Sequence, residues 1–314
     1  MKLLITGNCG YVGSVLTKKA LEEGHKVIGY DSLIHGEHIL NNFEQNPNLR
    51  IIKGDIREKE KLSPLIKQSD IVIHLAAIAR VDNPLHLEKE MEEVNRDASI
   101  EIAKLCKLYN KKMIFASTCS VYGLINEQEQ ADEKSSHAPT TIYARTKSEA
   151  EKGIIESKAD AVICRFATAY GPSPRMRYDL FINEITRDAF MRKKIELFDP
   201  NVWRCYIHTE DMAKAILFLI KREDIKKGIF NIGSTEQNTN KQQIVELIKK
   251  QVGDFQTKVL RDKRDPRNYK ILFGKIESEG FKAEKSISDG IKEMLSLLSQ
   301  SSEDPYNERF TNYK

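Results

Sequence analysis

A tyrosine and a lysine lie four positions apart at the start of a predicted helix, as Tyr143 and Lys147. This spacing places both side chains on one face of the helix, one turn apart. A phenol has an unperturbed pKa of about 10, and a lysine ammonium beside it favours the phenolate. We therefore expect Tyr143 to act as a base near neutral pH. Thr118 stands at the end of a predicted strand, where its hydroxyl would meet the same substrate oxygen.

Three glycines lie between an apolar run and a helical run near the N-terminus, as Gly7, Gly10 and Gly13. In a strand–turn–helix unit the first glycine permits the tight turn, the second lets a pyrophosphate approach the helix N-terminus, and the third allows close packing. The next predicted strand ends in Asp31, whose carboxylate would bind ribose hydroxyls and repel a 2′-phosphate. No arginine follows Asp31 directly, so the pattern predicts NAD rather than NADP.

The two motifs support each other. The spacing Tyr-x-x-x-Lys is common on helices by chance, but here it follows a dinucleotide-binding pattern and a strand that ends in a hydroxyl. The positive nicotinamide ring of NAD⁺ would further favour the Tyr143 phenolate. Lys147 would also hold the nicotinamide ribose.

Two further strand ends are candidates for the cofactor site, because ligands of an open parallel sheet bind at the carboxyl ends of its strands. Asp55 and Ile56 follow a short strand, and they either contact the adenine ring or form a turn or helix cap. His74 is interpreted as structural rather than catalytic. The small residues after it would let a cofactor lie against the backbone, as Leu75, Ala76 and Ala77.

Strands and helices alternate strictly up to residue 166, which predicts an α/β fold with a Rossmann-like, doubly wound parallel sheet. Beyond it short elements alternate irregularly, which indicates a smaller C-terminal α/β region that binds substrate. We expect an NAD-binding domain over 1–166, to which 204–232 returns. Residues 167–203 and 233–300 form the substrate-binding domain, and the sequence leaves open whether the polar tail 301–314 is ordered. The period of Pro84–Asn110 predicts one long helical stretch.

These residues resemble the extended short-chain dehydrogenase/reductase family of NAD-dependent nucleotide-sugar epimerases and dehydratases, with a pattern similar to UDP-glucose 4-epimerases. The resemblance spans about Met1–Leu298, and its marks are Thr6–Gly13, Asp31, Asp55-Ile56, His74–Ala77, Asn95, Ser117–Gly123, Tyr143–Lys147, Arg165–Pro172, Arg204–His208 with Asp211, and Asp265–Tyr269. It implies a tightly held NAD and a nucleoside-diphosphate sugar across the cleft. It also implies a homodimer, formed through helices in Pro84–Asn110 and Tyr143–Ser157.

The resemblance also assigns site residues. The catalytic set is Thr118, Tyr143 and Lys147. Further cofactor contacts are implied for Tyr11, Val12 and Asn95. The implied substrate contacts are Thr118, Thr168, Arg175, Arg177, Leu180, Arg204, Arg267 and Tyr269. Arg204, Arg267 and one of Arg175 and Arg177 are candidates for the diphosphate, because a guanidinium matches phosphate oxygens bidentately.

The residues after Thr118 select among the reactions of the resembled family. Dehydratases carry an Asp-Glu pair where Cys119 and Ser120 stand here, and decarboxylases usually carry Glu at the position of Ser120. A nucleotide-sugar 4-epimerase therefore fits best. Thr168 and Asp179 stand where epimerases usually have Asn, which leaves the nucleotide and the sugar open. The alternatives are a 4-dehydrogenase or 4-keto reductase of an unusual nucleotide sugar, such as a GDP-heptose, and an NAD-binding regulator without turnover.

Composition excludes several classes of partner. The 314 residues carry a net charge of +4 from 50 basic and 46 interspersed acidic residues, so we expect no nucleic-acid partner. No run of about 18 apolar residues exists, so we expect no membrane span. The first residues enter a strand directly, so we expect no signal peptide. Five scattered cysteines without a C-x-x-C pair suit a reducing cytoplasm and argue against a metal site.

Overall fold

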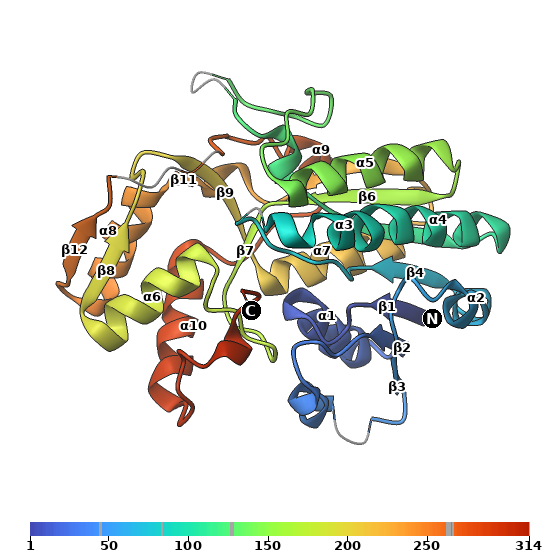
Figure 1. The fold of residues 1–314 in the computed structure, drawn as a ribbon, viewed down its shortest axis with the longest axis horizontal. Helices are drawn as coiled ribbons and strands as arrows, with labels where there is room; N and C mark the ends of the chain where they lie inside the picture. The colour runs from blue at the N-terminus through green and yellow to red at the C-terminus, as the bar shows by residue number, and fades with distance from the viewer. Residues whose placement is uncertain (44–45, 83, 126–128, 262–264, 266, 314) are drawn as a thin grey trace.

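A parallel sheet of seven strands forms the larger part of the molecule, in the order β10-β6-β5-β4-β1-β2-β3 (Figure 1). The computed structural model describes residues 1–43, 46–82, 84–125, 129–261, 265 and 267–313. The strands of this sheet are β1 (Lys2–Thr6), β2 (Lys26–Asp31), β3 (Leu49–Lys53), β4 (Ile71–His74), β5 (Lys112–Thr118), β6 (Ala161–Phe166) and β10 (Gly228–Ile232). Every neighbouring pair is parallel. The predicted doubly wound sheet is therefore confirmed.

Helices cover both faces of this sheet, so its strands are apolar on both sides. One face packs against α1 (Tyr11–Glu22) and α7 (Thr209–Lys221). The other packs against α2 (Lys59–Gln68), α4 (Ala98–Leu108) and α5 (Ile142–Glu156). Strand β1 shows the alternation, because Leu3 and Ile5 join the first core and Leu4 joins the second.

The strand order reverses next to β1, and this reversal places the ligand site. The chain runs from β1 through β2 to β3 on one side, and from β4 through β5 and β6 to β10 on the other. The carboxyl ends of β1 and β4 therefore flank a topological switch point, where open α/β sheets bind their ligands.

The predicted helical stretch over Pro84–Asn110 is confirmed, but it is not a regular α-helix throughout. The stretch is divided into a 3₁₀ turn η2 (Leu85–Leu87), a short α3 (Glu88–Met91), a π-helical segment η3 (Glu92–Asp97) and α4. The π-helical segment carries Asn95, whose Oδ1 accepts the Ile78 N–H at 2.8 Å. Its Nδ2 donates to the Ile78 carbonyl at 3.1 Å. The change of helical register thus serves to hold the loop that follows β4.

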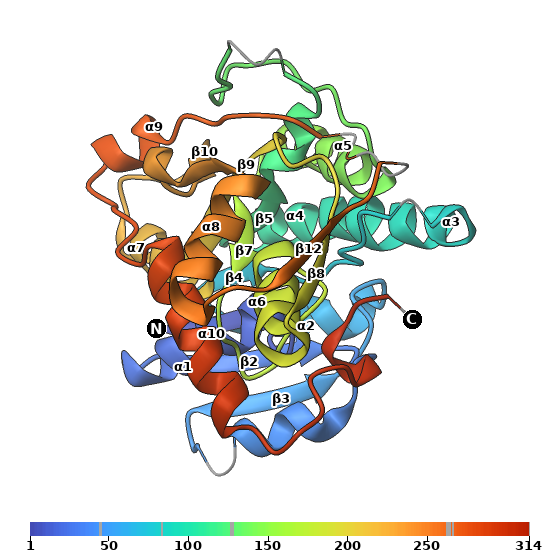
Figure 2. The same ribbon diagram turned by 90° about the vertical axis from the view of Figure 1, so that its left-hand side faces the viewer.

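A smaller region packs beside the carboxyl ends of the large sheet, on the left in Figure 1 and towards the viewer in Figure 2. Its strands are β7 (Thr168–Tyr170), β9 (Trp203–His208) and β11 (Asn238–Asn240) in one sheet, and β8 (Lys194–Leu197) with β12 (Gln256–Val259) in another. Its helices α6 (Phe181–Arg192), α8 (Lys241–Val252) and α10 (Ile287–Gln300) share a separate core. Because β9 lies in this region, only α7 and β10 of 204–232 return to the large sheet. The domain boundaries themselves stay a prediction.

The polar tail after α10 turns back along the molecule, and the C-terminus lies between the two regions in the view of Figure 1 and at the edge of the molecule in Figure 2. The Tyr178 N–H donates to the Phe310 carbonyl at 2.9 Å. Asn312 Nδ2 donates to the Ala79 carbonyl at 3.3 Å. Residues 301–313 are therefore packed against both regions. Within the described part of the chain, no helix is both long and apolar enough to cross a bilayer.

Candidate active site

A cavity of about 1080 Å³ lies at the carboxyl ends of the large sheet's strands and is closed on its other side by the smaller region. This volume exceeds the usual range of about 300–1,000 Å³ for a single small ligand. Every predicted site residue lines the cavity except Asn95 and Tyr269. Asn95 stands behind the wall and fixes the loop after β4, as described above. Pro266, in the segment Asp265–Tyr269, lies outside the described residues.

The glycine turn after β1 leaves the start of α1 open to the cavity. Gly7 has a φ of +72°, and a Cβ there would stand 2.7 Å from the Ala76 nitrogen. A Cβ on Gly13 would stand 1.9 Å from the Gly7 carbonyl oxygen, so only glycine lets the first turn of α1 pack this closely against the glycine turn. No side chain caps α1, and its first turn carries no acidic residue. The free N–H groups and the helix dipole therefore face the place of a cofactor pyrophosphate.

Asp31 is held in place at the end of β2 by two backbone N–H groups. Cys9 donates to its Oδ2 at 3.0 Å, and Leu33 donates to its Oδ1 at 2.9 Å. Burial raises the pKa of this carboxyl, and the two N–H donors oppose that shift. A carboxylate so fixed fits ribose hydroxyls and not a 2′-phosphate. The residues of this half of the cavity therefore fit an NAD-type dinucleotide.

Asp55 forms the turn that the sequence leaves open as one alternative, and a contact of Asp55 to the adenine ring stays a prediction. Its Oδ1 accepts the Arg57 N–H at 2.9 Å, which is an Asx turn, and its Oδ2 pairs with the Arg57 guanidinium at 2.6 Å. It also lines the cavity beside Ile56, which is buried. On the opposite wall, the loop after β4 lines the cavity with Leu75, Ala76 and Ala77.

The catalytic candidates meet in the cavity, where burial shifts the pKa of both the phenol and the ammonium. Lys147 is 1% exposed, and its Nζ donates to the Ala116 carbonyl at 2.8 Å. Burial lowers the Lys147 pKa to about 7. Burial also raises the pKa of Tyr143 to about 12, against the pull of Arg177. In the protein alone burial therefore outweighs the pull of Arg177, and the phenolate expected beside the positive nicotinamide ring of NAD⁺ stays a prediction.

A buried ion pair below these residues joins the helix to the sheet. Arg165 on β6 contacts Glu151 on α5 with its Nη2 at 2.7 Å and its Nε at 3.0 Å from Oε2. Ser117 on β5 donates its hydroxyl to the same carboxylate. This arrangement sets the register of α5 against β5 and hence the position of Lys147. The role of Glu151 escaped the sequence analysis, although Tyr143, Lys147 and Glu151 follow each other at intervals of four.

A cationic cluster forms at the substrate end of the cavity around Asp265. Arg204 pairs with the Asp265 carboxylate, Arg267 Nε lies 3.1 Å from its Oδ1, and Lys241 Nζ lies 3.3 Å from its Oδ2. The three cations lower the pKa of Asp265 to about 2. Three cations against one carboxylate leave an excess of positive charge, which suits a diphosphate. Lys241 carries no sequence signal for this role.

The remaining substrate candidates fall into two groups. Thr168 and Leu180 line the cavity, and Arg177 lines it while its Nε binds Asp179 at 3.1 Å. Tyr269 is 2% exposed and stands behind the wall, with its Oη 3.2 Å from the Ser120 hydroxyl. The Arg204 guanidinium lies 5.0 Å above its ring. Tyr269 therefore supports Arg204 rather than facing the cavity.

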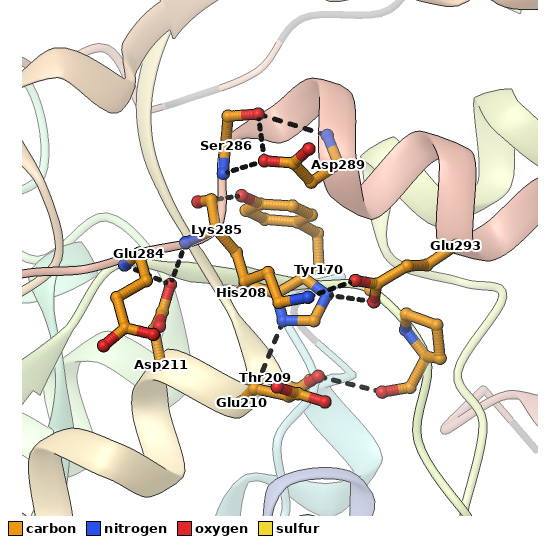
Figure 3. A network of polar contacts seen from close by, with 12 residues as sticks. Tyr170, His208, Thr209, Glu210, Asp211, Glu284, Lys285, Ser286, Asp289 and Glu293 are labelled. Carbon is orange, nitrogen blue, oxygen red and sulfur yellow. Dashed lines mark hydrogen bonds and ion pairs between the residues drawn. The ribbon is translucent and has the colours of Figure 1, made fainter.

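A polar network anchors the turn that leads from β7 to Arg175 and Arg177 (Figure 3). Thr209 Oγ1 donates to the Pro172 carbonyl at 2.8 Å. His208 Nδ1 accepts the Glu210 N–H at 3.2 Å, and its Nε2 lies 3.2 Å from Glu293 on α10. The turn is thus bonded to the start of α7, and His208, directly before that helix, contacts Glu293 in the middle of α10.

Comparisons with known proteins agree with this geometry. The model of the NAD dependent epimerase/dehydratase family matches residues 3–233. A putative UDP-glucose 4-epimerase of Methanocaldococcus jannaschii is 29% identical over 310 residues, which cover 94% of this chain and 98% of the relative. The dTDP-glucose 4,6-dehydratase of Bacillus anthracis, solved in complex with NAD, has a TM-score of 0.84 at 22% identity and covers 99% and 98% of the two chains. The UDP-glucose 4-epimerase of Thermotoga maritima, solved with UDP-glucose, has a TM-score of 0.83 at 24% identity over 96% and 99%.

Proposed function

Because the chain belongs to the NAD-dependent epimerase/dehydratase family, whose members are enzymes that use NAD, we propose that it is a nucleotide-sugar 4-epimerase. NAD supplies the hydride acceptor for oxidation of the sugar at C4 and the donor for its reduction. Tyr143 takes the proton of the C4 hydroxyl and returns it after the 4-keto sugar has turned in the cavity. Thr118 hydrogen-bonds the same oxygen, and Lys147 holds the nicotinamide ribose.

The observation that carries this choice is the chemistry of the two positions after Thr118. Cys119 and Ser120 are buried, and the Cys119 thiol donates to the Arg165 carbonyl at 3.2 Å. Burial raises the pKa of this thiol well above its usual value. Neither residue is able to act as the acid or base that elimination of water requires. Epimerisation needs no such pair, since one group both removes and returns the proton of the C4 hydroxyl, while the hydride of C4 goes to NAD⁺ and comes back from NADH.

The charges of the cavity support a nucleoside-diphosphate sugar as substrate. Arg204, Lys241 and Arg267 together exceed the charge of Asp265, and all three line the same cavity as the start of α1. The T. maritima epimerase was solved with UDP-glucose, which is a ligand of this chemistry. Asp179 stands where epimerases usually have Asn, and its carboxylate accepts a hydrogen bond from Arg177. This position therefore gives no assignment of the nucleobase of the substrate.

We also propose a homodimer that uses α4 and α5. Leu108 on α4 is 70% exposed and Ile155 on α5 is 55% exposed, and both are large apolar side chains. Light scattering during gel filtration should give twice the monomer mass. A monomer at micromolar concentration would contradict this proposal.

The test of the function is a panel of UDP-, GDP-, CDP- and dTDP-sugars incubated with the purified protein. Product identity is followed together with absorbance at about 340 nm, where reduced nicotinamide absorbs. A C4 stereoisomer without net reduced cofactor is the expected result. A keto product with accumulating NADH would instead identify a 4-dehydrogenase, and consumption of NADH by a keto sugar would identify a reductase. A dehydrated product would contradict the argument from Cys119 and Ser120.

A further inference from the structure

Arg175 differs from the other arginines of the cavity in having no anionic partner. It is 2% exposed and lines the cavity. No carboxylate of the described residues lies within ion-pair distance of its guanidinium, and its buried Nε has no hydrogen-bond partner. Its Nη2 donates only to the Thr311 carbonyl, at 3.2 Å. A buried cation with an unused donor is costly unless an anion joins it.

The backbone around Arg175 is bonded to the first turn of α1. Tyr11 Oη donates to the Gly171 carbonyl at 2.5 Å, and the Ser173 hydroxyl donates to the Tyr11 carbonyl at 2.6 Å. The Arg175 N–H points to the Ser14 hydroxyl at 3.4 Å. The charges that act on the Arg175 guanidinium are, in order of size, those of Arg177, Asp179 and Asp31. The backbone contacts place Arg175 beside the uncapped start of α1, in the cofactor half of the cavity.

We propose that Arg175 is a cofactor-binding residue whose guanidinium binds the pyrophosphate of NAD, so that it does not serve the diphosphate of the substrate. The proposal rests on the proposed function only in that NAD and a nucleoside diphosphate occupy separate halves of one cavity. The start of α1 offers N–H groups to one side of a pyrophosphate, and Arg175 offers two parallel N–H donors to the other. A 2′-phosphate is a poorer occupant, because the Asp31 carboxylate, which is held by a backbone N–H at each oxygen, would repel it.

The C-terminal tail holds Arg175 in this position. The Thr311 carbonyl accepts a hydrogen bond from Arg175 Nη2. The next residue, Asn312, joins Asp179 to the loop after β4. The Asn312 N–H lies 3.4 Å from Asp179 Oδ2, and its Nδ2 donates to the Ala79 carbonyl in the loop after β4. The Arg80 guanidinium lies over the Tyr313 ring, and its Cζ is 5.3 Å from the centre of that ring. The tail thus ties the segment that carries Arg175 to the wall of the cofactor half.

The test compares Arg175→Gln with Arg204→Gln, which changes an arginine of the substrate half in the same way. Calorimetry measures the affinity for NAD and for ADP-ribose, and then the affinity of the NAD-saturated protein for UDP, GDP, CDP and dTDP. We expect Arg175→Gln to weaken NAD and ADP-ribose by roughly ten- to a hundredfold and to leave the best-binding nucleoside diphosphate within about threefold. Arg204→Gln should show the reverse. Arg175→Lys keeps the charge and should recover most of the lost NAD affinity.

Three outcomes would overturn the assignment. One is unchanged NAD affinity in a folded Arg175→Gln protein with weaker nucleoside-diphosphate binding, which would place Arg175 on the substrate. Another is equal weakening of both ligands. The third is a failure of Arg175→Lys to recover affinity while its thermal midpoint matches the unsubstituted protein. None of these readouts needs turnover, so failure of the sugar panel would contradict the 4-epimerase and leave this result standing.

Discussion

Replacing Lys147 by Met should remove a pH dependence of stability that the buried ammonium creates. Burial lowers the Lys147 pKa to about 7 in the folded protein, against about 10.4 in an unfolded chain. Between these values the unfolded chain binds the proton and the folded protein does not, so the free energy of unfolding rises with pH. From pH 7 to pH 9.5 the gain works out at about 3 kcal/mol. Lys147→Met lacks this gain. Its free energy of unfolding should therefore exceed that of the unsubstituted protein by the largest amount near pH 7 and below.

The assay is urea unfolding followed by fluorescence and circular dichroism at several pH values, on protein stripped of nucleotide. The quantity compared is the difference in the free energy of unfolding between the two proteins at each pH, because this difference cancels the contributions of the other titrating groups. Lys152→Met is the matched control, since Lys152 is exposed on the same helix, and its curve should run parallel to that of the unsubstituted protein. Parallel curves for Lys147→Met as well would refute the argument, since the ammonium would then carry no cost of burial.

Three further substitutions test the site. Tyr143→Phe should lower kcat by about 10²–10⁴ while NAD affinity, measured by calorimetry, stays within a few-fold. Glu151→Gln leaves the 3% exposed Arg165 without its carboxylate, so urea unfolding should show a loss of about 3–5 kcal/mol. Gly13→Ala puts a Cβ 1.9 Å from the Gly7 carbonyl oxygen, so NAD titration should show little or no binding.

The cofactor half was predictable because its signals are local. The turn between β1 and α1 needs glycine at fixed intervals, and the end of β2 needs its acid within the same unit. Tyr143 and Lys147 share one helix face, so their spacing alone brings them together. The alternation of strands and helices gives the sheet, since parallel strands need helical crossovers. Each of these features lies within about thirty residues of chain.

Contacts between residues far apart in the sequence could not be predicted from a local pattern. Asn95 is marked only by the family resemblance, as a cofactor contact, and its bonds to Ile78 depend on a π-helical segment that the apolar period of Pro84–Asn110 does not show. The polar composition of the tail leaves open whether it is ordered, and its bonds to Ala79 and Tyr178 are formed with residues far away in the sequence. The phenol of Tyr143 keeps a high pKa because of its burial, and burial is a property of the whole fold.

The positive charge that a ligand meets in this cavity cannot be obtained by counting its arginines, because nearby carboxylates neutralise some of them. Arg177 is cancelled by Asp179, which is two residues away. Arg204 and Arg267 share one carboxylate with Lys241, which joins them from the start of α8, so these three cations keep an excess of positive charge. Arg175 keeps its whole charge, because the described chain gives it a carbonyl in place of a carboxylate. Two separate centres of positive charge result, one beside α1 and one around Asp265. An enzyme that holds a dinucleotide and a nucleoside-diphosphate sugar at once has two diphosphates to bind and needs such a pair.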